Sequence, residues 1–501
     1  MAEAHPTQIF MHNPQALRVE YRLDDERLIL WWSPRAGTSF DARDRNFSNR
    51  DNHLDVFESI ALPGCNLDAF ERCDYDPYHC VLHFREQVLH LAVMTDAPVV
   101  LVWAARPQAV DFKTARYDEA LTADAQAFVV RHAEPSYTFH FSARLGAGDG
   151  AFRHCRVHAP WNSYYPRARL AAGQLLAIGT GLEEDAVDGV VTQAAAASPD
   201  AHLQAIEAAL APATALGRTQ SSQHPELDAL RDGVARGLHS MIDASGAFRA
   251  SIKAIYYLIW IRDAGFAFAF QAAAGWPHRL RELCRLLLCN PNDARGGSVP
   301  EGRMFAQLIN RDYGKYEEDG AYYVVWTLFT YWTQTGSREF LDPGSLSLVE
   351  GAVDWLERYI FDAERGLFGE YFADETPAAG ARDHGWDYAI GKPGGDACIT
   401  HDGQRVTRSY DTYINLLMHA AYTMLAAMTD GDASVAYTAK AAALWKNLAP
   451  FFDDLQEGIP PYGELVLESG DRVMARHWGP ARSTFIWGLT MPCFAPIENL
   501  D

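Results

Sequence analysis

The sequence predicts a two-domain protein, in which an antiparallel β-sandwich precedes a domain of helices stacked in two layers, as in a double-layered helical barrel. Three observations predict this fold class. The chain has 501 residues, more than one hydrophobic core usually organises. Its apolar residues change from alternation to helical spacing near residue 200, and several later runs are apolar nearly all round. We expect the sandwich over residues 1–200, a helical linker over 201–225 and the helical domain over 226–501.

Short β-rich runs fill the first half of the chain. In SYTFHFSARL (136–145), the aromatic residues Tyr137, Phe139 and Phe141 alternate with polar ones, which predicts a half-buried strand. RLILWWS, QVLHLAVM, APVVLVWAA and QAFVVRH are similar runs, separated by turns rich in Gly, Pro or Asp. Many short strands without helices between them predict an antiparallel sandwich or barrel.

Helical patterns dominate after residue 200. HLQAIEAALAPATAL predicts a helical linker, and HPELDALRDGVARGLHSMI predicts a helix with Pro225 at its first position. Asp342 followed by Pro343 predicts a capped helix start. Three further stretches have helical patterns: residues 320–333, 408–428 and 434–449. YYLIWIRDAGFAFAFQAAAG is apolar nearly all round, so it needs burial on both sides, as in the inner layer of a helical barrel.

Charge and motifs exclude several functional classes. The net charge of −22 repels phosphate backbones, so we expect no nucleic-acid partner. A dinucleotide fingerprint, a P-loop, an HExxH helix, an EF-hand loop and a GxSxG elbow are all missing in the contexts they require. This disfavours redox, kinase and serine-hydrolase activities, and we expect neither a cofactor nor a metal ion.

The cysteines and the N-terminal segment bear on the compartment. The eight cysteines form no CxxC pair, which predicts free, mostly buried thiols in a reducing compartment. MAEAHPTQIF lacks a basic segment followed by an apolar run, so it does not read as a signal peptide. No stretch approaches the roughly 20 apolar residues of a membrane span. We therefore expect a cytoplasmic protein that does not insert into a membrane.

Two polar segments occur where sugar-binding chemistry would fit. Trp260-Ile261-Arg262-Asp263 sets an indole beside an adjacent ion pair in a very apolar region. A buried charge pair costs several kcal/mol unless it is well partnered. It is therefore either a structural ion pair or a clamp, in which Arg262 and Asp263 bind sugar hydroxyls while Trp260 covers an apolar sugar face.

The second segment is YGKYEEDG (313–320), which precedes the helical run AYYVVWTLFTYW. Its aromatic and acidic residues include Tyr313, Glu318 and Asp319. One interpretation is a solvated loop with an acidic helix cap. The other is the rim of a cleft at the mouth of a helical barrel.

Two glutamates differ from the chain's other acids because each lies beside glycine and aromatic residues. Glu370 lies in GLFGEYF (366–372), and Glu464 lies in PPYGEL (460–465). Inverting hydrolysis of a glycosidic bond needs one protonated carboxyl for the leaving oxygen and one carboxylate that activates water. Aromatic neighbours help to keep an acid protonated because they desolvate its charged form. The alternative is that both glutamates are ordinary solvent-exposed residues.

These segments resemble, in order and rough spacing over about residues 226–501, motifs of the glucoamylase family of inverting exo-glycosidases. WIRD resembles its sugar-holding Trp-x-Arg-Asp motif, and YGKYEEDG its aromatic loop before a helix. GLFGEYF resembles the general-acid segment, and YGELVLESGDRVMARHWGPARSTFIWGL the general-base segment. The resemblance implies an N-terminal β-sandwich, a linker and an (α/α)6 barrel. It also implies Glu370 as acid and Glu464 as base.

Two departures from the family pattern affect the site. The family's acid follows a Trp directly, whereas Phe368 and Gly369 precede Glu370 here, so Glu375 and Asp383 stay open as alternative acids. The segment RDHGWD (382–387) has no clear counterpart in the family. We expect its Trp386 and also Phe368 to lie in the sugar pocket.

The resemblance implies an enzyme that releases a terminal, α-linked glucosyl residue from an oligosaccharide. Three other functions stay open. A phosphorylase of the same fold would need a cationic phosphate site, and a polysaccharide lyase would need a Tyr or His base. A non-catalytic protein would use the aromatics to bind carbohydrate only. Five residues offer positive charge for the phosphorylase alternative: Arg405, Arg408, Arg476, His477 and Arg482.

Overall fold

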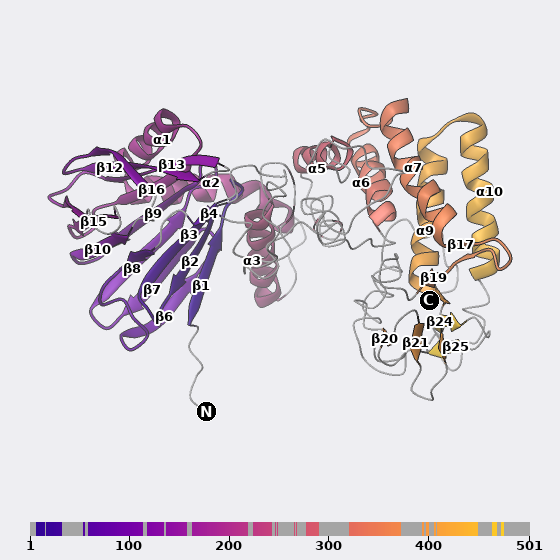
Figure 1. The fold of residues 1–501 in the computed structure, drawn as a ribbon, viewed down its shortest axis with the longest axis horizontal. Helices are drawn as coiled ribbons and strands as arrows, with labels where there is room; N and C mark the ends of the chain where they lie inside the picture. The colour runs from indigo at the N-terminus through magenta and orange to yellow at the C-terminus, as the bar shows by residue number, and fades with distance from the viewer. Residues whose placement is uncertain are drawn as a thin grey trace. The chain divides into compact units, whose positions relative to one another are not determined.

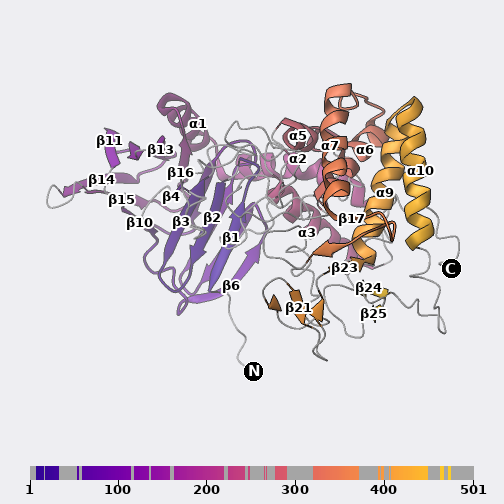
Figure 2. The ribbon, with the colours of Figure 1, turned by 45° about the vertical axis from the view of Figure 1, so that its right-hand side comes forward.

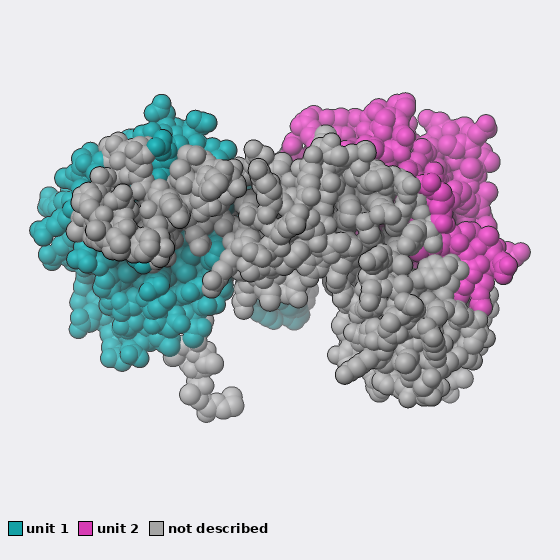
Figure 3. Space-filling view, viewed as in Figure 1, with its two compact units in different colours: residues 1–258 teal, residues 259–501 magenta. Residues whose placement is uncertain are grey.

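The chain folds into two compact units in the computed structural model, residues 1–258 and 259–501. Figure 3 colours them separately. The structure describes residues 7–15, 17–32, 54–55, 59–113, 118–134, 137–157, 163–218, 224–242, 246, 248, 265, 267, 277–289, 320–371, 393–394, 397–399, 405–406, 408–448, 463–467 and 472–474. The boundaries expected from the sequence, 1–200, 201–225 and 226–501, stay predictions.

Two antiparallel sheets enclose one hydrophobic core in the first unit, as expected for this half of the chain (Figure 1). The first sheet has the order β1 (Gln8–His12), β2 (Leu17–Arg22), β3 (Arg27–Trp32), β5 (Ser59–Ala61), β10 (Gln108–Lys113), β15 (Ser163–Leu170) and β14 (Ala151–Val157), with β4 (Leu54–Asp55) paired to β3. The second has the order β11 (Asp118–Ala123), β12 (Ala127–Glu134), β13 (Tyr137–Leu145), β16 (Leu176–Gly181), β9 (Val99–Ala104), β8 (Gln87–Val93), β7 (His79–Phe84) and β6 (Phe70–Tyr75).

The sequence pattern placed β13 correctly but missed the helix that covers it. Phe139 and Phe141 are buried in the core, as their alternation predicts. Ser142, on the polar side, is also buried and donates a hydrogen bond to Asp188 (3.0 Å) of helix α1 (Glu184–Ala196). Helix α1 packs on β13 and β16. A Cβ on Gly179 of β16 would lie 2.5 Å from a Val191 methyl carbon, so the glycine permits this close packing.

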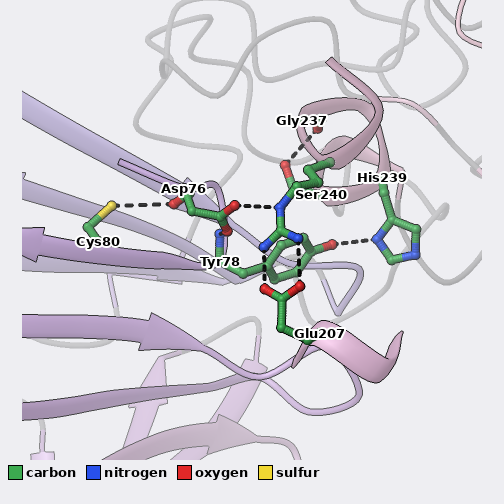
Figure 4. Close-up of polar contacts among 8 residues, drawn as sticks. Asp76, Tyr78, Cys80, Glu207, Gly237, His239 and Ser240 are labelled. Carbon is green, nitrogen blue, oxygen red and sulfur yellow. Dashed lines mark hydrogen bonds and ion pairs between the residues drawn. The ribbon is translucent and has the colours of Figure 1, made fainter. Parts of the chain in front are cut away.

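A polar joint attaches the next two helices to the β-strands of the first unit. Helix α2 (Pro199–Arg218) covers the expected helical run, and α3 (Pro225–Met241) begins with the expected proline. Arg236 of α3 binds Asp76 (2.5 Å), which follows β6, and both carboxylate oxygens of Glu207 (2.8 and 3.0 Å) on α2 (Figure 4). Beside it, the Tyr78 hydroxyl is hydrogen-bonded to His239 Nδ1 (2.7 Å).

Helices make up most of the described part of the second unit, so the helical character predicted for this half is confirmed. They are α5 (Pro277–Cys289), α6 (Gly320–Thr335), α7 (Pro343–Ile360), α9 (Thr412–Met428) and α10 (Gly431–Leu448). Helix α6 packs on α5, α7 and α9, and α9 packs on α10. The last four lie side by side in Figures 1 and 2. Closure of these helices into an (α/α)6 barrel stays a prediction.

Helix starts were predicted with mixed success. Asp342 caps α7 as expected, because its carboxylate accepts hydrogen bonds from the amides of Gly344 (2.9 Å) and Ser345 (3.1 Å). The prediction of a helix from residue 408 was wrong. Residues 408–411 form strand β23 (Arg408–Asp411), which pairs with one strand on each side, and α9 begins at Thr412. Pairing on both edges outweighs the local helical pattern.

Short strands complete the second unit. Strands β17 (Phe361–Asp362) and β18 (Leu367–Phe368) form a hairpin, and β20 (Pro393–Gly394), β21 (Ala397–Ile399) and β22 (Arg405–Val406) form a small sheet. A four-stranded sheet has the order β19 (Glu370–Tyr371), β23, β24 (Gly463–Leu467) and β25 (Arg472–Met474). Within the described ranges, every helix is too short or too polar to cross a membrane.

Candidate functional site

The four-stranded sheet brings together the two segments that carry the predicted acid and base. Glu370 begins β19, and Glu464 is the second residue of β24. Both strands pair with β23, which lies between them. Segments that are 94 positions apart in the sequence (464 minus 370) therefore share one sheet.

The strand register gives the spacing of these two backbone positions. Glu370 pairs with Ser409 of β23, and Ser409 pairs on its other side with Leu467. Glu464 lies three residues before Leu467 in β24. Two strand spacings across and three residues along put the two Cα atoms about 14 Å apart. An irregularity in the pairing with β25 falls between Gly463 and Leu465, and such bulges change the local direction of a strand.

A tight hairpin precedes Glu370. Asp362 accepts hydrogen bonds from the amides of Glu364 (2.9 Å) and Arg365 (3.2 Å), which makes an Asx-type turn. Gly366 closes the turn with a φ of 65°, in the left-handed region that favours glycine. The amide of Gly369 then donates to the Ile360 carbonyl (2.8 Å), so the backbone is hydrogen-bonded up to the residue before Glu370.

Strand β23 also contacts this hairpin through a side chain. The Tyr410 hydroxyl donates to the Asp362 carboxylate (2.5 Å), and the Arg365 guanidinium lies over the Tyr410 ring, 4.8 Å from its centre. Tyr410 also pairs with Val466 of β24. One residue therefore links the hairpin before Glu370 to the strand that contains Glu464.

Helix α9 holds the same hairpin from inside the unit. Asn415 is completely buried, and its side-chain amide is hydrogen-bonded to both the amide and the carbonyl of Phe368. The Phe368 amide donates to Asn415 Oδ1 (2.8 Å), and Asn415 Nδ2 donates to the Phe368 carbonyl (3.0 Å). This two-point contact lies two residues before Glu370.

The Phe368 ring packs against two aromatic rings, one of which is hydrogen-bonded to a charged group. It contacts the rings of Phe361 and Tyr422 at centroid distances of 5.1 and 6.3 Å. The Tyr422 hydroxyl donates to Glu357 (2.7 Å), and burial, followed by the Glu357 charge, raises the pKa of Tyr422. Lys440 neutralises Glu357 at 2.7 Å. In this structure the fully buried Phe368 ring supports the strand that leads to Glu370.

The remaining predicted site residues lie outside the described residues. They are Trp260, Arg262, Asp263, Tyr313, Glu318, Asp319 and Trp386, together with the alternative acids Glu375 and Asp383. Of the cationic residues of the phosphorylase alternative, Arg405 begins β22 and Arg408 begins β23. Arg476, His477 and Arg482 lie outside the described residues. The predicted sugar clamp therefore stays a prediction.

Comparisons with known proteins bear on the fold. No family model matches the chain, and no curated protein matches it. Among solved structures, it is similar to a bacterial glucoamylase complexed with acarbose, at 11% identity and a TM-score of 0.49, over 93% of this chain and 69% of that one.

Two other solved structures are similar to the chain. One is a GH92 family glycosyl hydrolase, at 12% identity and a TM-score of 0.45, over 93% of this chain and 63% of that one. The other is a protein named kojibiose phosphorylase from the human microbiome, at 7% identity and a TM-score of 0.44, over 87% of this chain and 57% of that one.

A hollow in the first unit is a second place to consider for binding. It has a volume of about 360 Å³ and lies between β9, β16 and α1, with Trp32, Thr180 and Glu183 in its lining. Most of the other lining residues are glycine, valine or leucine. Glu183 is the only carboxylate in this lining, so the hollow lacks the pair of acids that glycosidic hydrolysis requires.

Three residues of the candidate site were missed in the sequence. Asn415 and Tyr410 both lie in the stretch that was assigned wholly to a helix, and Asp362 was not singled out. For Asn415 a signal was present, because it is the one amide in the apolar run TYINLLMHAAYTMLAAM. A polar residue buried in such a run needs a hydrogen-bond partner. Which backbone group it binds depends on the tertiary fold.

Proposed function

We propose that this chain is an inverting glycoside hydrolase that releases a terminal, α-linked glucosyl residue from an oligosaccharide. Glu370 protonates the leaving oxygen, and Glu464 deprotonates the attacking water. The observation that most supports this assignment is the pairing of both strands, β19 and β24, with β23. Without that sheet, the two segments would have no structural relation.

The proposed inverting reaction sets a requirement on the distance between the two carboxyl groups. An inverting enzyme needs its two carboxyl groups roughly 6.5–9.5 Å apart, so that a water molecule fits beside the sugar. The Cα atoms of Glu370 and Glu464 are about 14 Å apart by the strand register. Because Glu464 lies an odd three residues from Leu467, the proposal requires the irregularity beside Glu464 to turn its side chain to the face of Glu370. A retaining enzyme needs the closer spacing of about 5–5.5 Å.

The rest of the proposal concerns sugar binding and domain roles. Arg262 and Asp263 bind ring hydroxyls of the terminal sugar, and Trp260 covers its apolar face. Residues 226–501 form the catalytic domain, with the helices closed into an (α/α)6 barrel. The remaining pocket lining consists of Tyr313, Glu318, Asp319 and Trp386, whereas the fully buried Phe368 supports the strand before Glu370. Free cysteines, of which Cys65, Cys80 and Cys284 are buried, fit a reducing compartment, so we infer a cytoplasmic protein.

Substrates that differ in their leaving group test the two glutamate roles. Glu370→Gln should lower kcat on disaccharides about 10²- to 10⁴-fold, the usual contribution of a general acid. It should spare α-glucosyl fluoride, whose leaving group needs little proton transfer. Glu464→Gln should lose activity on both substrates, because both need activated water. Glu364→Gln, an exposed glutamate on the same hairpin, is the matched control and should behave like the wild type.

The product separates this proposal from its alternatives. Proton NMR should show β-glucose as the first product from an α-linked substrate. An α-product or a trapped glycosyl-enzyme would exclude the single-displacement mechanism. Glucose phosphate formed on adding phosphate would identify a phosphorylase, and an unsaturated product would identify a lyase. Binding without any turnover would leave a carbohydrate-binding protein.

A further inference from the structure

The buried amide of Asn415 has an unusual partner, because it binds one backbone residue at two points. Its Oδ1 accepts from the Phe368 amide at 2.8 Å, and its Nδ2 donates to the Phe368 carbonyl at 3.0 Å. The side chain therefore replaces a neighbouring strand at that residue. The contact is fully buried, where an unpaired backbone group is costly. Both hydrogen bonds would be lost if the Asn415 amide were removed.

The same stretch of chain holds the Glu370 backbone in a second way. Ser409 of β23 pairs with Glu370, and α9 begins directly after β23. Asn415, six residues after Ser409, then binds Phe368. Strand β19 is therefore held by backbone pairing at Glu370 and by the Asn415 amide two residues earlier. Both restraints come from residues 408–415.

Gly369, which lies between Phe368 and Glu370, makes the contact of Asn415 with Phe368 important. Glycine allows more backbone conformations than any other residue. Two residues of extended chain span about 6.6 Å, so the position of Phe368 limits where the Glu370 backbone can lie. A catalytic group must be held to within roughly 0.5 Å of its productive position. The Gly369 amide bond to Ile360 alone does not fix the chain on the side of α9.

We propose that Asn415 is a positioning residue for the general acid: by binding both polar groups of Phe368, it fixes the backbone that carries Glu370 relative to strand β23. This rests on the proposed function, because it assigns the acid role to Glu370. Asn415 itself does not touch the sugar in this proposal. Its removal should therefore impair proton donation to the leaving oxygen and leave sugar binding largely intact.

Asn447 offers a matched control on the same hairpin. Its Nδ2 donates to the carbonyl of Gly366 at 3.2 Å, from helix α10. It makes one bond to the hairpin instead of two, at the turn four residues before Glu370. Asn447 is only partly buried. Asn447→Ala thus removes an amide–backbone contact from the hairpin without releasing the residues next to Glu370.

The first measurement does not depend on activity. Amide hydrogen exchange of the full-length protein is compared for the wild type, Asn415→Ala and Asn447→Ala. Asn415→Ala should speed exchange in the peptide that covers residues 368–371 by about 10- to 100-fold, as expected for the loss of two buried hydrogen bonds. Asn447→Ala should leave that peptide close to the wild type. Unchanged exchange at residues 368–371 in Asn415→Ala overturns the proposal, whatever the enzyme does.

The second measurement uses a series of aryl α-glucosides with progressively poorer leaving groups, together with α-glucosyl fluoride. Asn415→Ala should lower kcat about 10- to 100-fold on the poorest leaving group, with KM within about threefold and the fluoride nearly unaffected. The alkaline limb of the pH–rate profile should also move, because that limb reports the acid. An equal loss on every substrate would mean that Asn415 only stabilises the fold.

A second variant and the activity of the wild type distinguish failure of the positioning role from failure of the proposed function. Asn415→Leu keeps the side-chain volume and removes both hydrogen bonds, so it should behave like Asn415→Ala, and it replaces that variant if Asn415→Ala fails to fold. A wild-type protein without inverting turnover refutes the proposed function. In that case, faster exchange at residues 368–371 in Asn415→Ala still supports the two-point contact. The proposed role of Asn415 in proton donation is then refuted together with the proposed function.

Discussion

The joint between α3 and the β-strands of the first unit allows a quantitative test at Arg236. The side chain of Arg236 is 17% exposed and binds two carboxylates, those of Asp76, 25% exposed, and Glu207, 65% exposed. Arg236→Ala removes both ion pairs. It leaves Asp76 partly buried beside the hydrogen-bonded pair Tyr78–His239 (Figure 4). We expect this substitution to loosen α3.

The stability lost in Arg236→Ala can be estimated from how exposed each of its two carboxylate partners is. The bond to Asp76 is partly buried and charge-assisted, so its loss should cost about 1.5–3 kcal/mol. The pair with Glu207 is mostly exposed and should contribute no more than about 1 kcal/mol. A double-mutant cycle should therefore give a larger coupling energy for Arg236 with Asp76 than for Arg236 with Glu207.

Local hydrogen exchange suits this measurement, because a chain with two compact units need not unfold in one step. In Arg236→Ala, amides of α3 should exchange about 10- to 150-fold faster, which corresponds to about 1.4–3 kcal/mol. Arg231→Ala is the control, since Arg231 pairs within the same helix, with Asp228 and Asp232, and it should change exchange less than about fivefold. Equal effects of the two substitutions, or a larger coupling with Glu207, would refute the assignment of the joint's stability to the Asp76 contact.

Two further predictions concern acid stability and the sugar clamp. Burial, then the neighbouring His79 and His83, lowers the pKa of His90 to about 4. The folded protein therefore favours the neutral form of His90. The free energy of unfolding should then fall as the pH drops from 6.5 toward 4, because the unfolded chain binds a proton that the folded chain does not. After allowance for the partial exposure of His90, we expect a loss on the order of 1–2 kcal/mol. In thermal unfolding, His90→Gln, which cannot titrate, should lose less stability than the wild type between pH 6.5 and 4. An identical loss in the two proteins would mean that other groups cause it. For the clamp, Arg262→Ala or Asp263→Ala should lower kcat/KM about 10- to 150-fold, the loss of one charged hydrogen bond to a hydroxyl, and folded variants with wild-type kinetics would leave only a structural ion pair.

The elements predicted correctly are those whose burial is repeated along the chain. The alternation in residues 136–145 identified β13, and Asp342-Pro343 identified the start of α7. The helix α1 was missed because its large apolar residues are few: of its buried residues, only Val187 and Val191 are larger than alanine. The burial of Ser142 on the polar side of β13 was missed as well, since a covering helix cannot be predicted from the strand's own pattern.

The error at residues 408–411 has a different cause. RSYD is short, and the apolar helix that follows it dominates any local pattern. Strand β23 exists because β19 and β24 offer unpaired backbone groups on both of its edges, and Tyr410 adds a bond to Asp362. Pairing with segments so distant in the sequence leaves no periodic signal in the strand itself.

The sequence by itself determined the two-part organisation, the helical nature of the second half and the two glutamates that stand among glycine and aromatic residues. These features depend on residue type and short-range spacing, which any window of the sequence shows. Only the tertiary structure decided that the strands of Glu370 and Glu464 share β23, and that Asn415 holds Phe368 at two points. Those relations join residues 47 to 94 positions apart (415 minus 368; 464 minus 370). They form because buried backbone groups must find hydrogen-bond partners wherever the folded chain brings one within reach.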